Sequence, residues 1–234
     1  MSGFKCFNSN RKDSNSGGVC IGVRKALAAG VNEVCSNSCE DIVIVKLKAS
    51  FFNLDKDINL VNVYNSPANG SYKRRRQLLD EEVPTTLEHL AECLANIPAS
   101  EDVAVLGDMN ARTGSLNDIL SPWDFIDPSS NPEEQFNAII SEIPGRNNSD
   151  HIINSFGKPF IELIQTCRLI ILGDIFGAPT CIQRNGASTI DYICTSPSLF
   201  QQVRYFEVGG LCQYQMEGSF LIPPRTTPSS GNSG

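Results

Sequence analysis

One stretch of the chain combines an expected buried strand with residues that could handle a phosphate. Residues 103–106 are apolar and lead into Gly107, Asp108, one spacer and Asn110. A continuous apolar run that ends at a turn residue predicts a strand buried on both faces, with polar residues at its carboxyl end. Asp108 could hold a metal ion or a water, and Asn110 could bind a phosphate oxygen. The alternative is a plain strand-to-turn corner, in which both side chains only satisfy local backbone groups.

Two further expected strands carry polar residues that could reach a cleft. Tyr64 ends the run 58–64 beside a turn stiffened by Pro67, and its hydroxyl could act as a hydrogen-bond donor. A packed aromatic ring with a solvated hydroxyl is the alternative. Asp191 interrupts the apolar run 188–194. Because an unpaired carboxylate inside a strand is costly, Asp191 needs a partner, a metal ion or an exit to a cleft.

The other expected elements position these residues. Each is predicted as a strand or a helix from the spacing of its apolar residues. They are strands at 17–24, 41–52 and 58–64, the last two paired as a hairpin; a helix at about 72–94 interrupted at Pro84; a helix opening at Asn154; a strand at 169–173; a hairpin around Asn185–Gly186; and a strand at 203–208. The span 113–148 has little regular pattern, which is typical of a functional insertion or a surface loop.

Composition limits the class of protein. The 234 residues fit one large domain, and the net charge of −7 argues against broad electrostatic capture of nucleic acid. The dense basic run at 73–76 is interpreted as a solvated helix turn rather than a DNA contact. Nine cysteines without a C-x-x-C pair indicate reduced thiols and an intracellular location. The chain has no apolar stretch approaching ~18 residues, so we expect no membrane partner.

The order of the motifs resembles the endonuclease/exonuclease/phosphatase superfamily, and most closely the apurinic-type endonuclease domain of non-LTR retrotransposons. The matching pieces, in the order of that family, are Val-Tyr-x-x-Pro at 63–67, Gly-Asp-Met-Asn-Ala-Arg at 107–112, Asn-Ser-Phe-Gly at 154–157, Pro-Thr-Cys at 179–181 and Ser-Thr-Ile-Asp-Tyr-Ile at 188–193. The resemblance covers roughly residues 16–208, and the second and last pieces are specific in combination.

The resemblance implies an α/β fold, a four-layer α/β sandwich of two face-to-face β-sheets flanked by helices. It also implies hydrolysis of DNA phosphodiester bonds that depends on Mg²⁺ or Mn²⁺, with a reverse transcriptase domain downstream in the parent protein. The matching motifs also imply roles for individual residues. Asp108 would orient or deprotonate the attacking water and is the candidate metal ligand, and Asp191 would orient the catalytic histidine of the family. Asn110 would hold a non-bridging phosphate oxygen, Tyr64 would donate a hydrogen bond to the phosphate, and Thr180 and Arg112 would bind substrate.

The chain also departs from the pattern of the family. The metal-binding Glu of the family and its closing Ser-Asp-His have no counterpart in the expected places, and Ser149-Asp150-His151 comes too early to count. We therefore expect a partial domain at 16–210, incomplete at its terminal strands, between a frayed segment at 1–15 and a disordered tail at 211–234. The expected activity is impaired. The alternatives are a non-catalytic remnant or binding module, and a phosphatase acting on inositol phosphates or nucleotides.

Overall fold

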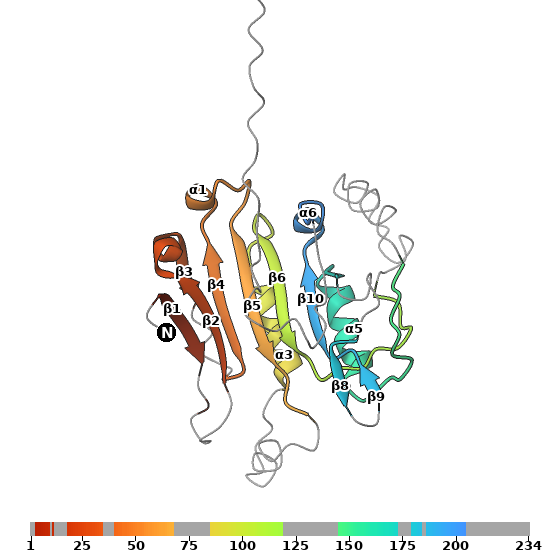
Figure 1. The fold of residues 1–234 in the computed structure, drawn as a ribbon. Helices are drawn as coiled ribbons and strands as arrows, with labels where there is room; N and C mark the ends of the chain where they lie inside the picture. The colour runs from red at the N-terminus through yellow and green to blue at the C-terminus, as the bar shows by residue number, and fades with distance from the viewer. Residues whose placement is uncertain are drawn as a thin grey trace, which may run out of the picture.

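A six-stranded mixed sheet forms the centre of the structure, a computed structural model that describes residues 3–9, 11, 18–34, 40–67, 85–118, 145–172, 179–183 and 186–204. The strand order is β3-β4-β5-β6-β10-β7 (Figure 1). The strands are β3 (Val31–Val34), β4 (Ile42–Leu47), β5 (Ile58–Tyr64), β6 (Asp102–Asp108), β10 (Asp191–Thr195) and β7 (Ile170–Ile171). Within this sheet β5 and β6 run parallel, and the other neighbouring strands run antiparallel.

The expected hairpin at 41–64 is present as β4 and β5, with Ile42 opposite Val63 and Leu47 opposite Ile58. The first strand is shorter than its sequence suggests, because the chain enters the short helix α1 (Ala49–Phe52) directly after Lys48. Asn53 then adopts a left-handed conformation, which asparagine tolerates better than most residues. The connection therefore turns through one helical turn and a left-handed residue.

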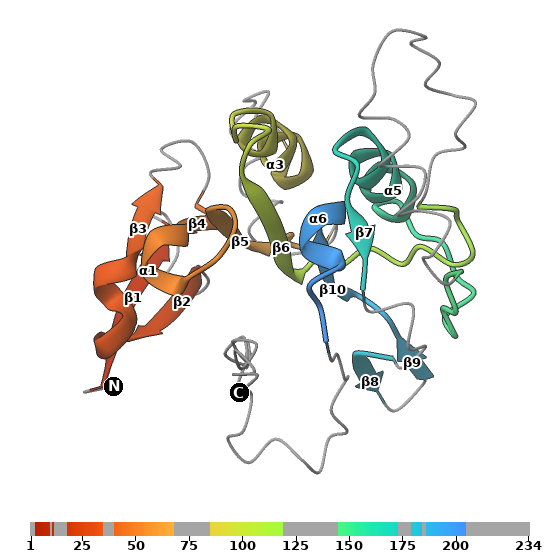
Figure 2. The ribbon, with the colours of Figure 1, turned by 90° about the horizontal axis from the view of Figure 1, so that it is seen from above.

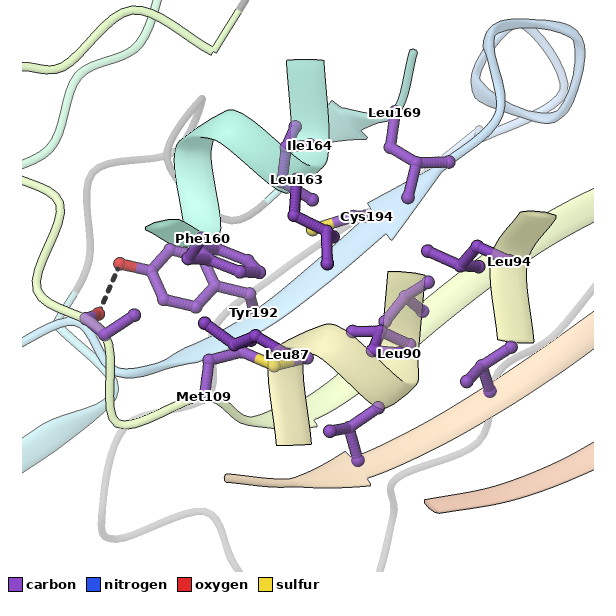
Figure 3. Packing of buried hydrophobic residues seen from close by; sticks show 14 of the residues in the cluster. Leu87, Leu90, Leu94, Met109, Phe160, Leu163, Ile164, Leu169, Tyr192 and Cys194 are labelled. Atoms are coloured by element: carbon purple, nitrogen blue, oxygen red, sulfur yellow. Dashed lines mark hydrogen bonds between the residues drawn. The ribbon is translucent and has the colours of Figure 1, made fainter. Parts of the chain in front are cut away.

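Two helices cover one face of the main sheet. They are α3 (Thr86–Ala95) and α5 (Gly157–Thr166), and both lie on the same side of the sheet in Figure 2. A capping box begins α3: Thr85 Oγ1 accepts a hydrogen bond from the Glu88 amide at 3.2 Å, and Glu88 Oε2 accepts one from the Thr85 amide at 2.5 Å. Leu90 and Phe160, both fully buried, pack the helices onto the sheet (Figure 3).

The opposite face of β4 and β5 is covered by a two-stranded antiparallel sheet of β1 (Phe4–Ser9) and β2 (Val19–Arg24). Phe7 is buried with Val43 and Val45 in a second, smaller core. Residues 4–9 therefore correct the expectation of a frayed segment at 1–15. The strand has little signal in the sequence because Phe7 is its only buried residue, while Phe4, Lys5, Cys6 and Asn8 are exposed.

The remaining elements are short. They are the 3-10 helix η1 (Lys25–Gly30), the hairpin strands β8 (Cys181–Gln183) and β9 (Gly186–Ser188), and α6 (Pro197–Phe200). The hairpin expected around Asn185–Gly186 is thus confirmed, although the run 188–194 divides into the end of β9 and β10. β8 and β9 pair antiparallel, with Cys181 opposite Ser188.

The predicted α/β sandwich is confirmed by this arrangement of a helix layer, a mixed sheet and a second sheet. Several expectations fall outside the described residues: the helix at 72–84, the basic run at 73–76, most of the span 113–148, the strand at 205–208 and the tail at 211–234. The described cysteines are free thiols. No helix in the described part of the chain is long and apolar enough to cross a membrane.

Gly107 provides a test of the close approach between β5 and β6. Its φ is +139°, and a Cβ atom there would lie 1.9 Å from the carbonyl oxygen of Val63. We expect Gly107→Ala to lower the free energy of unfolding by about 3 kcal/mol, because the clash involves backbone that cannot move aside. Gly22→Ala, where the nearest atom lies 3.8 Å away, is the matched control in urea unfolding. Equal losses at the two glycines would contradict this account.

Candidate active site

Tyr64, Asp108 and Asp191 lie side by side on three neighbouring strands. Tyr64 at the end of β5 is the parallel register partner of Asp108 on β6, and Asp108 is the antiparallel partner of Asp191 on β10. Register partners place their side chains on the same face of a sheet. Because Val63 and Tyr192 point into the helix-covered core, these three side chains lie on the opposite face. We call Tyr64, Asp108 and Asp191 the polar row.

The turn after β6 brings Asn110 to the same edge. Asn110 has a φ of +47°, and its amide donates a hydrogen bond of 2.9 Å to Asp108 Oδ1. Its side-chain Nδ2 donates to the carbonyl of Asn65 at 2.8 Å, and Asn65 Nδ2 donates to the carbonyl of Met109 at the same distance. The two asparagines thus tie together the ends of β5 and β6. An amide nitrogen carries two hydrogens, so Asn110 keeps donor capacity for a ligand.

Thr180 binds the backbone at the start of β10, next to Asp191 of the polar row. Its Oγ1 accepts hydrogen bonds of 3.1 Å from the amides of both Ile190 and Asp191. The carbonyl of Ile190 in turn accepts a hydrogen bond of 2.9 Å from the Met109 amide. Thr180 therefore fixes the start of β10 and the position from which the Asp191 side chain leaves the strand.

Arg112 forms a bidentate ion pair with Asp150. Arg112 Nε and Nη2 donate to the two carboxylate oxygens at 2.7 and 2.6 Å, and the Asp150 side chain is only 2% exposed. The carboxylate also accepts from the amides of Ile152 and Thr189. Burial opposes its ionisation, but the hydrogen bonds from Arg112 and the backbone outweigh burial and lower the pKa of Asp150. Asp150 of the early Ser-Asp-His triplet thus fixes Arg112, whose expected contact with substrate stays a prediction.

Asn154 is a positioning residue whose role could be read only in part from the Asn-Ser-Phe-Gly motif. Its Oδ1 accepts from the amides of Arg112, Phe156 and Gly157 at 3.0 to 3.1 Å, and its Nδ2 donates to the carbonyl of Asn110 at 2.7 Å. An asparagine before a helix predicts a capping contact. The contacts to residues more than 40 positions earlier carry no local signal.

The two carboxylates of the polar row influence each other. Burial raises the pKa of Asp108, and the negative charge of Asp191 raises it further, while hydrogen bonds from Asn110 oppose both effects. In the described part of the chain, no group of three or more His, Cys, Asp or Glu side chains could hold a metal ion. Mg²⁺ is usually bound through one or two protein carboxylates together with waters and substrate phosphate oxygens, and Asp108 and Asp191 are oxygen donors of that kind.

Solved structures share this fold. The endonuclease domain of TRAS1, a telomere-specific non-LTR retrotransposon, is similar with a TM-score of 0.50 and 16% identity, over 86% of this chain and 70% of that chain. The AP endonuclease LMAP from Leishmania major is similar with a TM-score of 0.50 and 14% identity, over 86% of this chain and 64% of that chain. At these identities, the similarity is one of fold alone.

A sequence family described as endonuclease-reverse transcriptase matches residues 58–212, which include every residue of the polar row. The chain belongs to this family. The resemblance predicted from the motifs is therefore confirmed. A comparison with curated proteins finds no match.

The raised pKa of Asp108 predicts a stability that depends on pH. An ionised carboxylate is disfavoured at this position, so the folded state loses stability as the pH rises through the folded pKa of Asp108. Asparagine can still accept the Asn110 amide and carries no charge. We expect Asp108→Asn to raise the free energy of unfolding by about 0.5 kcal/mol at pH 7.

This gain should vanish below the ordinary carboxyl pKa of 3.8, where both proteins are neutral at position 108. Urea unfolding at the two pH values measures it. Glu33→Gln on the exposed side of β3 is the control and should change little at either pH. A gain that is the same in acid and at neutral pH would argue against a charge effect.

The ion pair between Arg112 and Asp150 makes a separate prediction. Asp150→Asn leaves the Arg112 guanidinium facing an amide, so we expect the free energy of unfolding to fall by about 3 kcal/mol. Chemical denaturation measures the loss, and Lys158→Gln, which breaks an exposed ion pair of 3.8 Å with Glu162, is the matched control with an expected loss of about 0.5 kcal/mol or less. If both variants lose equally little, the buried pair has no structural importance.

Proposed function

We propose that this chain is an endonuclease-type domain whose polar row handles a DNA phosphodiester. The observation that carries the proposal is the register of β5, β6 and β10, which brings Tyr64, Asp108 and Asp191 together from three separate segments of sequence. The endonuclease domain of TRAS1 and the match to the endonuclease-reverse transcriptase family support a nucleic acid over a small phosphoester as substrate.

The residues of the chain suggest how such a site would act. Tyr64 would donate its hydroxyl to a phosphate oxygen, and the second Nδ2 hydrogen of Asn110 would donate to another. Asp108 would accept a proton from the attacking water, and the raised pKa of its carboxyl brings that group closer to neutral pH. Phosphoryl transfer needs mainly positioned donors and a positioned water, which these groups supply.

A divalent cation, Mg²⁺ or Mn²⁺, remains an expectation of the resemblance alone. Asp108 and Asp191 would supply only part of its coordination, with waters and the phosphate supplying the rest, and the roles above involve only side chains of this chain. The assay below supplies Mg²⁺ and repeats each reaction in EDTA.

We further propose that the 234-residue chain has impaired activity. It contains two histidines, His89 and His151. His89 is buried on α3, which packs on the opposite face of the sheet, and His151 is exposed. Among the described residues, none donates a hydrogen bond to the Asp191 carboxylate. A carboxylate that lacks its histidine partner leaves a catalytic unit incomplete, which costs on the order of 10³-fold or more in rate.

Nicking of supercoiled plasmid tests the proposal. We expect slow, Mg²⁺-dependent nicking that Asp108→Ala abolishes and Glu33→Gln leaves unchanged. Added imidazole should accelerate the reaction, because it can supply the missing proton acceptor. Fast nicking without imidazole that still depends on Asp108 would refute impairment while supporting the endonuclease. Nicking that survives Asp108→Ala would refute the assignment of the site.

The second candidate function is a DNA-binding module without catalysis, and the absence of a hydrogen-bond partner for the Asp191 carboxylate among the described residues favours it. Binding of labelled duplex DNA in EDTA, together with the absence of any Mg²⁺-dependent nicking even with imidazole, would support this function instead. Release of phosphate from small phosphoesters without DNA cleavage would point to the phosphatase alternative.

A further inference from the structure

Arg11 lies next to the polar row, in a segment that carries no recognised motif. Its side chain is 6% exposed and pairs with Asp41, whose side chain is 5% exposed. Arg11 Nε donates to Asp41 Oδ1 at 2.8 Å, and Nη2 donates to Ser66 Oγ at 2.5 Å. The guanidinium carbon lies 5.2 Å from the centroid of the Tyr64 ring, within the range of a cation–π contact. We call these four residues the Arg11 cluster.

The Arg11 cluster holds Tyr64 by its backbone as well as by its ring. The carbonyl of Asp41 accepts a hydrogen bond of 3.0 Å from the Tyr64 amide, so one residue binds both Tyr64 and Arg11. The Tyr64 ring also packs against the smaller core around Phe7. Among the described residues, none hydrogen-bonds the Tyr64 hydroxyl. The ring is therefore fixed while its hydroxyl is left for a ligand.

We propose that Arg11 is a positioning residue that fixes the Tyr64 ring so that its hydroxyl is directed at a phosphate bound beside Asp108. This inference rests on the proposed function, which supplies the phosphate. A donor that is already oriented needs no reorganisation when the anion binds, and this is how a hydrogen bond becomes effective in such a site. Because Asp41 offsets the charge of Arg11, the effect comes from orientation rather than from attraction of the anion.

The planar shape of the guanidinium is needed for this role. It can stack on an aromatic ring while its edge donates to two acceptors, whereas an ammonium group is a compact charge without a flat face. Arg11→Lys should therefore keep the ion pair with Asp41 but release the Tyr64 ring. Arg11→Gln combined with Asp41→Asn removes both charges together, so that neither is left buried and unpaired.

The first measurement needs no ligand. The chain has five tyrosines, and 3-fluorotyrosine labelling gives each a ¹⁹F resonance, with Tyr64→Phe identifying the signal of Tyr64. We expect both Arg11 variants to shift or broaden that signal. Arg24→Gln, at an exposed arginine that ends β2, is the control and should leave it unchanged. Circular dichroism verifies that each variant is folded. A Tyr64 signal that is unchanged in the folded double variant would overturn the proposal.

The second measurement is a double-mutant cycle on the affinity for a fluorescein-labelled DNA duplex, measured by anisotropy in EDTA. Arg11→Lys and Tyr64→Phe should each weaken binding about fivefold, the effect of one lost hydrogen bond. In the Tyr64→Phe background, Arg11→Lys should have no further effect, because Arg11 acts through the Tyr64 hydroxyl. Fivefold losses that multiply in the double variant would mean that Arg11 acts on DNA independently, and would overturn the proposal.

The two measurements separate this inference from the proposed function. A wild-type chain that does not bind DNA, together with a Tyr64 resonance that depends on Arg11, would refute the nucleic-acid function while supporting the positioning of the ring. DNA binding that depends on Tyr64, together with a resonance indifferent to Arg11, would do the reverse.

Discussion

The pairing of β6 with β5 on one side and with β10 on the other is the constraint on which the site depends. Side chains alternate between the two faces of a sheet, so a register shift of one residue would turn Asp108 into the helix-covered core. Val103 and Val105 oppose such a shift because both are buried in that core. Exposing either would cost roughly 1.5–3 kcal/mol. The apolar face of β6 therefore determines where the carboxylate emerges.

Tyr192 links this register to the loops on both sides of the polar row. Its ring is fully buried, with its centroid 4.8 Å from that of Phe160. Its hydroxyl lies 3.2 Å from Thr113 Oγ1, and its single proton is shared between the carbonyls of Ala111 at 2.9 Å and Thr189 at 3.1 Å (Figure 3 shows one of these bonds). A buried hydroxyl with all its partners present makes a rigid junction. The residue after Asp191 thus connects the helix core to the turn that carries Asn110.

The sequence predicted those parts of the site that have local signals. The apolar run before Asp108 indicates a buried strand, and the hairpin ending at Tyr64 follows from alternation and turn residues, as does the strand that Asp191 interrupts. The sequence could not predict contacts between polar residues that lie far apart in the chain. Arg11 and Asp41 are separated by 30 positions: Arg11 lies between Asn10 and Lys12 in a polar stretch of sequence, and Asp41 directly precedes the apolar strand β4, so neither position signals the other. Only the packing of β1 and β2 on β4 brings such residues together.

The charge of the site sets a condition on any anionic ligand. Asp108 and Asp191 face the same space, and Arg11 beside Tyr64 is offset by Asp41. Two unit charges 4 Å apart repel by about 1 kcal/mol in bulk water, and by more in a half-buried site. A phosphate therefore needs positive charge or a proton beyond what these four groups supply. Burial raises the pKa of Asp108, so a proton binds there more readily. The polar row thus becomes more receptive to an anion as the pH falls.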